Sequence, residues 1–259
     1  MADLICSLIL CTFGGVVAAT CGVLALLPKR AGNKRLDGHG GILLGRGIME
    51  VAYKLFEPLV NLLHSARVTP NMVTAFSLAP ALVSAALIAL GHFGVGALLA
   101  TGSGFCDMVD GMLARRYGSM SDVGELFDAA VDRYVEYFLL AGLILYFRGS
   151  PIALVLCLGA VLGSFMVSYT TAKAEALGVV PPKGAMRRAE RAVYVLVGCG
   201  LAPIWELVVP NAHPVASISL GRELPIEITL LVVAVVANIS AVRRMFRIAE
   251  LIRAKKLAA

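Results

Sequence analysis

The chain has 259 residues, of which 59% are hydrophobic and only 15% are charged, and its mean hydropathy is +0.84. Ordinary soluble domains are about 45–50% apolar and about 25% charged, so this composition excludes that class and indicates an integral membrane protein. The net charge of +6 would also suit a protein that binds nucleic acid. No DNA- or RNA-reading motif accompanies that charge, and we expect no nucleic-acid partner.

The first apolar run extends from residue 4 to residue 27. The residues before it include Asp3 but no Lys or Arg, and no clear small-residue cleavage site follows, which argues against a signal peptide. Four basic residues between positions 29 and 35 should remain in the cytoplasm. We therefore predict that residues 1–28 form an extra transmembrane helix whose N-terminus lies outside.

Residues 29–68 are expected to form a cytoplasmic linker and an interfacial helix. A glycine-rich stretch covers positions 38–47, and apolar residues then recur at helical spacing from Ile48 to Leu63. The opposite side of that helix carries charged residues, which is typical of an amphipathic helix lying in the membrane interface. An ordinary packed helix is the alternative.

Residues 69–259 are predicted to form an all-α bundle of six transmembrane helices, because the sequence lacks the alternating pattern of a membrane β-barrel. The predicted spans are Asn71–Leu90, Phe93–Arg115, Asp122–Phe147, Ile152–Leu177, Arg188–Val209 and Ile226–Ala249.

The basic residues orient this bundle. Of the 23 Lys and Arg residues, only Arg148 and Arg222 fall on the outer side of the predicted topology. Such a bias follows the positive-inside rule and favours contact with anionic lipid headgroups. We expect a protein of the inner (cytoplasmic) membrane whose active site faces the cytoplasm.

Four aspartates interrupt this hydrophobic sequence at the cytoplasmic ends of the second and third core helices: Asp107, Asp110, Asp128 and Asp132. A carboxylate near hydrocarbon is costly, so each requires a partner charge or a function. Residues three or four apart share a helix face at about 5–6 Å. The short connection at residues 117–122 makes the two helices antiparallel neighbours, so all four carboxylates should meet.

Carboxylate oxygens favour Mg²⁺, Mn²⁺ or Ca²⁺ over zinc or copper. Two facing pairs can hold two divalent ions at the spacing of about 3.5–4 Å that phosphoryl chemistry uses. The leading hypothesis is therefore a metal-dependent reaction at the membrane surface. An ion transporter with intramembrane aspartates is the competing class, but it predicts carboxylates near the midplane and inverted repeats, neither of which the sequence shows.

The same residues carry a resemblance to a known family. Residues 107–132 match the pattern D-x2-D-G-x2-A-R-x8-G-x3-D-x3-D of the CDP-alcohol phosphatidyltransferases, position for position. The resemblance implies transfer of a substituted phosphate from a CDP-linked donor to an alcohol, with release of CMP. It implies metal ligation by Asp107, Asp110 and Asp128, with Asp132 as the base for the acceptor hydroxyl and a further contact to metal.

The resemblance also implies a group of positions near the cytidine and diphosphate of the donor. Carried onto this sequence, the CDP-binding positions are Asn71, Gly111, Ala114, Arg115, Ser121 and Gly124. The cofactor that it implies is a pair of Mg²⁺ or Mn²⁺ ions.

A second segment bears on the acceptor. Residues 168–178 and 187–191 resemble the S-Y-x-K-A-R-A-E-A-x-G and E-R-P-E-R segments of the bacterial phosphatidylinositol phosphate synthase branch. The residues that this resemblance assigns to the acceptor's phosphate are Ser168, Lys173, Arg188 and Arg191. Lys173 replaces an Arg and Thr171 a Lys of that branch, which weakens the match.

The preferred reaction therefore joins CDP-diacylglycerol to an inositol-phosphate-like polyol phosphate. Glycerol phosphate, inositol or serine as acceptor stays an alternative, as does a CDP-aminoalcohol that reacts with diacylglycerol. Membrane lipids and a second copy of the chain are the other expected partners, the latter from small-residue helix faces such as Gly96, Ala100 and Gly104 and from the family resemblance.

Overall fold

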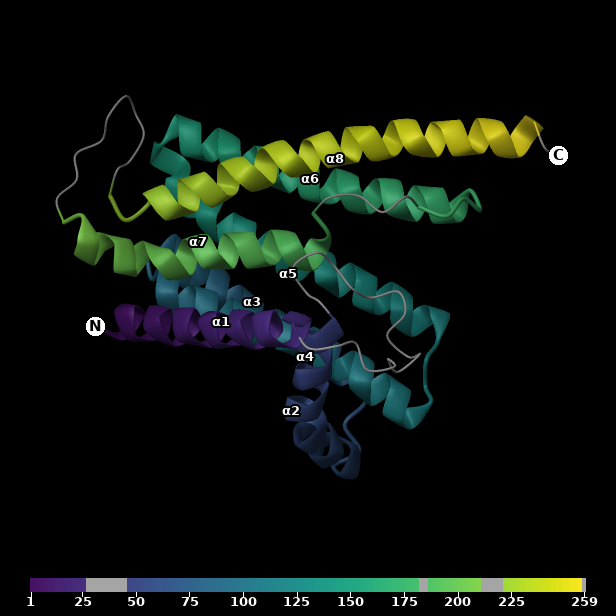
Figure 1. The fold of residues 1–259 in the computed structure, drawn as a ribbon, viewed down its shortest axis with the longest axis horizontal. Helices are drawn as coiled ribbons and strands as arrows, with labels where there is room; N and C mark the ends of the chain where they lie inside the picture. The colour runs from purple at the N-terminus through teal and green to yellow at the C-terminus, as the bar shows by residue number, and fades with distance from the viewer. Residues whose placement is uncertain (27–45, 182–185, 211–220, 258–259) are drawn as a thin grey trace. The chain divides into compact units, whose positions relative to one another are not determined.

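The computed structural model describes residues 1–26, 46–181, 186–210 and 221–257, and for residues 16–26, 46–52 and 256–257 it describes the helical backbone alone. These residues form helices and short turns and contain no strand (Figure 1). The chain divides into two compact units, residues 1–139 and residues 140–259, and the division falls inside helix α5.

Among its described residues, the first unit contains four complete helices and the beginning of a fifth. They are α1 (Ala2–Leu26), α2 (Arg46–Ser65), α3 (Pro70–Ala89), α4 (Phe93–Tyr117) and the first part of α5 (Asp122–Tyr146). Helix α4 packs along α3 and also contacts α1 and α2. It is therefore the central element of this unit.

Small residues and hydroxyl groups join α3 to α4. A Cβ atom added to Gly96 would lie 2.5 Å from Cγ1 of Ile88, so glycine is needed for this close approach. The Ser84 hydroxyl donates to the carbonyl oxygen of Gly96 at 2.7 Å, and the Ser103 hydroxyl donates to that of Ser77 at 2.8 Å. Such hydrogen bonds hold helices together where there is no water to compete.

The N-terminal helix packs on the first turn of α4. The Asp3 carboxylate accepts a hydrogen bond from the backbone N–H of Val95 at 2.9 Å, which satisfies a donor that the first turn of α4 leaves open. A Cβ atom at Gly94 would lie 2.2 Å from the carbonyl oxygen of Asp3. Further along, the rings of Phe13 and Phe105 meet edge to face at 5.9 Å.

The turn between α4 and α5 is built from small residues. Gly118 ends α4 in the left-handed region (φ 61°), and the N–H of Ser119 returns to the carbonyl oxygen of Ala114 at 3.1 Å. The Ser121 hydroxyl then accepts from the N–H of Gly124 at 3.1 Å and caps α5. The signature region is thus two helices joined by a tight reversal.

The second unit contains α6 (Pro151–Ala176), α7 (Arg188–Val208) and α8 (Leu224–Leu257), after a short 3₁₀ helix, η2 (Phe147–Gly149). Helix α8 packs against both α6 and α7. The Asn238 side chain donates to the carbonyl oxygen of Gly159 at 2.8 Å and links α8 to α6.

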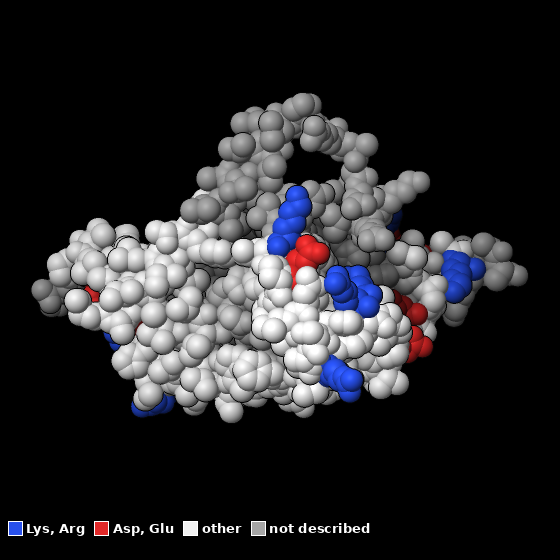
Figure 2. Space-filling view, turned by 90° about the horizontal axis from the view of Figure 1, so that it is seen from below, with Lys and Arg blue, Asp and Glu red and all other residues white. Residues whose placement is uncertain are grey.

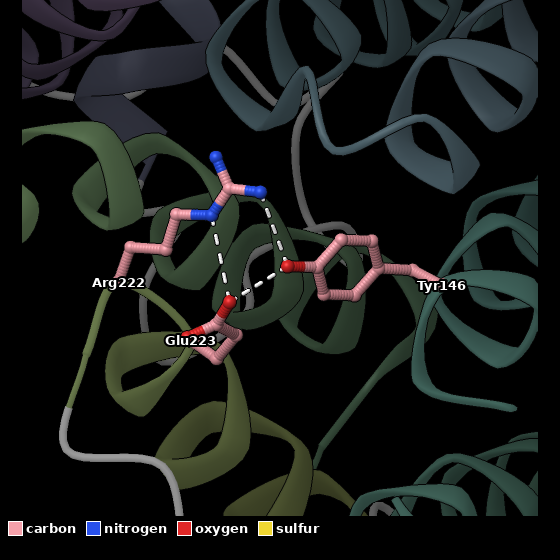
Figure 3. Close-up of polar contacts among 3 residues, drawn as sticks. All are labelled: Tyr146, Arg222 and Glu223. Carbon is pink, nitrogen blue, oxygen red and sulfur yellow. Dashed lines mark hydrogen bonds and ion pairs between the residues drawn. The ribbon is translucent and has the colours of Figure 1, made fainter. Parts of the chain in front are cut away.

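A polar cluster fixes the segment that leads into α8. The Tyr146 hydroxyl donates to Glu223 at 2.7 Å, and Arg222 donates to Tyr146 at 3.2 Å and to Glu223 at 3.4 Å (Figure 3). Burial alone would lower the pKa of Arg222, but the hydrogen bond with Tyr146 and the nearby carboxylates raise it above its ordinary value. Arg222 is one of the two arginines predicted on the outer side. It is therefore a charged residue whose charge is balanced by its neighbours and which holds this segment in place.

The helices follow the predicted spans within two residues at all but one boundary. The exception is α8, which continues past Ala249 to Leu257. Its last turns contain good helix formers and an ion pair between Arg247 and Glu250 at 2.9 Å, and no Gly or Pro stops them.

Within the part of the chain that the structure describes, four helices are long and apolar enough to cross a membrane: α3, α6, α7 and α8. Figure 2 shows a face on which uncharged residues predominate and Lys, Arg, Asp and Glu occur in scattered places. The protein is an integral membrane protein. Because charged residues shorten the apolar runs of α4 and α5, the full count of seven spans stays a prediction, and the glycine-rich stretch at 38–47 lies mostly outside the described residues.

Candidate metal centre and active site

Three of the four predicted aspartates converge. Asp107 and Asp110 lie on α4 and Asp128 on α5, and one carboxylate oxygen from each lies within 4.8 Å of the others. Asp110 is 5% exposed, and the other two are half-buried. Three carboxylates this close repel one another strongly unless a cation lies among them. The all-oxygen donor set fits Mg²⁺ or Mn²⁺.

Helix α3 contributes a residue that the sequence analysis missed. The Thr74 hydroxyl donates a hydrogen bond to Oδ2 of Asp110 at 2.5 Å, and Thr74 is only 5% exposed. Partners of this kind orient a ligand carboxylate and leave its other oxygen for metal. The only available signal was a threonine near the start of an apolar span, and nothing in the sequence links it to Asp110.

Asp132 is outside the group of three. It follows Asp128 by one helical turn on α5 and is half-buried. It is thus a fourth carboxylate on the same side of α5 as Asp128.

Three of the positions assigned to the nucleotide lie together at the start of α5. The Ser121 cap holds the first turn, and a Cβ atom at Gly124 would lie 3.8 Å from Oδ1 of Asn71. Glycine therefore leaves the backbone of this turn open beside the Asn71 amide. The three residues come from α3, the turn and α5.

The remaining nucleotide positions lie on α4. The Arg115 guanidinium folds back along the helix, with its nitrogens 3.6 Å from where a Cβ atom of Gly111 would stand. Ala114 is half-buried beside it. Arg115 also contacts Tyr53 of α2, a residue that the sequence analysis did not single out.

The residues assigned to the acceptor belong to the second unit and differ in their surroundings. Arg191 is 1% exposed and donates to the carbonyl oxygen of Met186 at 3.1 Å. Arg188 is half-buried, whereas Lys173 is exposed. The Ser168 hydroxyl donates to the carbonyl oxygen of Ser164 on its own helix at 3.1 Å.

Arg244 of α8 joins this region, and the sequence analysis missed it. Arg244 is 9% exposed. Its guanidinium donates to the Thr171 hydroxyl and lies close enough to Arg187 and Arg191 for their charges to interact. Among the described residues, its buried Nε has no hydrogen-bond partner. An arginine inside an otherwise apolar span indicates a functional site. In the sequence, Arg244 was counted only as one of the basic residues on the cytoplasmic side.

Guanidinium groups of like charge that lie near each other attract phosphate and carboxylate anions. Arg191 and Arg244 are such a pair, with Arg187 nearby and the Thr171 hydroxyl between α6 and α8. The second unit therefore contains a place suited to a phosphate or carboxylate group.

The chain matches the family model described as CDP-alcohol phosphatidyltransferase over residues 67–252. It is 30% identical over 200 residues to the phosphatidylinositol phosphate synthase of Mycobacteroides abscessus, which covers 76% of this chain and 84% of that protein.

Two solved structures of the phosphatidylinositol phosphate synthase of Mycobacterium tuberculosis are similar. The one in complex with manganese and citrate has a TM-score of 0.64 and 25% identity, covering 74% of this chain and 87% of that chain. The one with CDP-diacylglycerol bound has a TM-score of 0.63 and 26% identity, covering 75% and 94%.

Proposed function

This chain belongs to the CDP-alcohol phosphatidyltransferase family, and we propose that the acceptor in its reaction is inositol phosphate. It is a metal-dependent membrane enzyme that transfers a phosphatidyl group from CDP-diacylglycerol to a polyol phosphate and releases CMP. The choice among polyol phosphates is supported by the similar synthases and by the buried arginines of the second unit.

The aspartates of α4 and α5 hold Mg²⁺ or Mn²⁺, which polarises the diphosphate and offsets the charge on departing CMP. The proposed ligands are Asp107, Asp110 and Asp128, with Asp132 available as a contact to a second ion. Thr74 fixes Asp110, so the ligand set is ordered before the donor arrives. These three carboxylates are the observation that supports metal-dependent transfer.

The donor's diphosphate is bound by Arg115, while Asn71, Gly111, Ala114, Ser121 and Gly124 shape the surroundings of the nucleotide. The glycines leave backbone exposed where a phosphate or ribose must come close, and a guanidinium provides paired donors for phosphate oxygens. In this assignment, residues of α4 both bind the metal and recognise the diphosphate.

Asp132 acts as the general base. It removes the proton of the acceptor hydroxyl while that oxygen bonds to the phosphatidyl phosphorus, and the bond from this phosphorus to the CMP oxygen breaks with its electron pair going to CMP. No redox change occurs. Asp132 is suited to the role because it lies one turn beyond the ligand Asp128.

The acceptor's own phosphate binds the arginines of the second unit. Arg191 and Arg244 are buried, carry like charge and lie near each other, which favours a bound dianion over an uncharged polyol. Arg188, Lys173 and Ser168 complete the proposed acceptor set. Thr171, which stands where the phosphatidylinositol phosphate synthase branch has a lysine, accepts a hydrogen bond from Arg244, so a cation still reaches this position from α8.

We place the metal side of the protein at the cytoplasmic leaflet, because the basic residues concentrate there in the predicted topology. CDP-diacylglycerol enters that leaflet from the bilayer, and the polar acceptor arrives from the cytoplasm. A homodimer is proposed from the family membership; the Gly96 face of α4 is used inside the chain, against α3.

The decisive experiment uses purified protein with labelled CDP-diacylglycerol, Mg²⁺ and a panel of polyols and polyol phosphates, scored by CMP release. We expect release only with inositol phosphate at a substantial rate. Equal rates with free inositol would refute the phosphorylated acceptor. An Arg191→Ala variant should have a raised KM for the acceptor and an unchanged KM for the donor.

A further inference from the structure

Helix α2 contacts the signature arginine directly. The guanidinium of Arg115 donates a hydrogen bond to the Tyr53 hydroxyl at 2.6 Å, and the Arg115 Cζ lies 5.3 Å from the centroid of the Tyr53 ring. The contact thus combines a charge-assisted hydrogen bond with a cation–π interaction. Tyr53 is half-buried, whereas Arg115 is exposed.

The amphipathic pattern of α2 explains why Tyr53 faces α4. Val60 is 3% exposed and packs with Phe56 and Leu63 against Val109 and Leu113 of α4. Positions 53, 56, 60 and 63 follow one another at helical spacing, so Tyr53 extends the buried stripe by one turn.

The opposite side of α2 is apolar and exposed, with Leu55 at 61% and Leu62 at 64%. This is the side expected to enter the lipid interface. Docking of α2 therefore fixes the position of the tyrosine ring over the end of α4.

We propose that Tyr53 is a positioning residue for the donor: it holds the Arg115 guanidinium against Gly111, ready for the diphosphate of CDP-diacylglycerol. The inference rests on the proposed role of Arg115 and adds a residue outside the signature. It also gives the interfacial helix a task in donor binding.

The physical reason is the flexibility of arginine. An exposed arginine side chain samples many rotamers, and ordering it on binding costs free energy. Tyr53 restricts Arg115 before the donor arrives, while the guanidinium keeps further N–H groups for phosphate oxygens. Since the restraint acts on binding of the diphosphate in the ground and transition states alike, it should change KM for the donor and leave kcat nearly unchanged.

The chain offers a matched control. The Tyr117 hydroxyl at the end of α4 donates to the carbonyl oxygen of His64 at 3.2 Å, and the two rings lie 4.5 Å apart. This phenol also joins α4 to α2, but its hydrogen bond does not involve Arg115. Tyr117→Phe therefore removes one hydrogen bond between α2 and α4 and leaves the Tyr53–Arg115 contact in place.

The test compares Tyr53→Phe, Tyr53→Ala and Tyr117→Phe with the full-length wild type in detergent. Binding of CDP in the presence of Mn²⁺ is measured by calorimetry, and the KM values for donor and acceptor are measured by CMP release. Loss of a hydrogen bond to a charged group should weaken CDP binding by about three- to tenfold in Tyr53→Phe. Loss of the ring as well should weaken it by about tenfold or more in Tyr53→Ala. In both Tyr53 variants, kcat and the acceptor KM should stay within about twofold of wild type. In Tyr117→Phe, CDP binding and all three kinetic values should stay within about twofold of wild type.

A double-mutant cycle separates positioning from general stability. In an Arg115→Ala background, Tyr53→Phe should change CDP binding by less than about twofold, because the group that it positions is gone. Independent effects of the two substitutions would overturn the inference. So would a Tyr53→Phe variant that binds CDP like the wild type, or a Tyr117→Phe variant that loses as much.

The outcome also distinguishes this inference from the proposed function. If wild-type protein binds no CDP with Mn²⁺, the proposed function fails. If the wild type binds CDP and Arg115→Ala weakens it while the Tyr53 variants do not, the proposed function stands and only the role of Tyr53 is refuted.

Discussion

The hydrogen bond from Thr74 to Asp110 provides a sensitive test of the metal centre. Thr74→Val keeps the size and branching of the side chain and removes the hydroxyl, so packing between α3 and α4 should persist. Asp110 is buried, and its Oδ2 accepts from Thr74 at 2.5 Å. In Thr74→Val that oxygen loses this donor.

The magnitude follows from the geometry. A distance of 2.5 Å is at the short end for a hydroxyl donating to a carboxylate, which indicates a charge-assisted bond. Removing one such partner of a buried charge costs about 1.5–3 kcal/mol. Each 1.4 kcal/mol corresponds to about tenfold in a binding constant, so we expect Mn²⁺ affinity to fall by about 10- to 100-fold.

The assay is Mn²⁺ binding to purified protein, followed by electron paramagnetic resonance, together with the Mn²⁺ concentration that gives half-maximal CMP release. Thr101→Val is the control, because its hydroxyl donates only to the carbonyl oxygen of Ala97 on its own helix, at 2.8 Å. Both readouts should shift in Thr74→Val and neither in Thr101→Val. Wild-type Mn²⁺ affinity in Thr74→Val would refute the claim that α3 orients this ligand.

Three further substitutions test the other assignments. Asp132→Asn should lower kcat by about 100-fold or more while Mn²⁺ binding stays within about threefold, as expected of a base; wild-type turnover would disprove that role. Arg244→Ala should raise the acceptor KM by about tenfold or more and leave the donor KM unchanged, and an unaltered acceptor KM would remove Arg244 from the pocket. Gly94→Leu should displace the Asp3 contact and destabilise the protein by about 1–3 kcal/mol, measured as a lower thermal unfolding midpoint in detergent. Gly102→Leu, where a Cβ atom meets nothing within 4 Å, should leave that midpoint unchanged, and equal effects of the two leucines would contradict the packing of α1.

The helices and their class could be predicted from local sequence because apolar length and periodicity are properties of the chain itself. The two aspartate pairs could be predicted in the same way, since residues three and four apart share a helix face whatever the helix packs against. The length of α8 was underestimated because the prediction followed apolar residues, whereas helix formation continued through a polar segment.

The role of α1 shows a different limit. The sequence separated residues 1–28 as an extra helix and gave no partner for it. Its contacts with Gly94 and Val95 join residues about 90 positions apart, and the sequence of neither segment predicts this contact. In the structure α1 is part of the same unit as the three clustered aspartates.

The sequence by itself determined that this is a helical membrane protein with a carboxylate site of defined spacing, because composition, periodicity and motif are all local. Only the tertiary structure decided which partners complete the sites: Thr74 on Asp110, Tyr53 on Arg115, and Arg244 beside Arg191. Each of those contacts joins helices distant along the chain. Their choice depends on how helices rotate and pack against one another, which no single segment specifies.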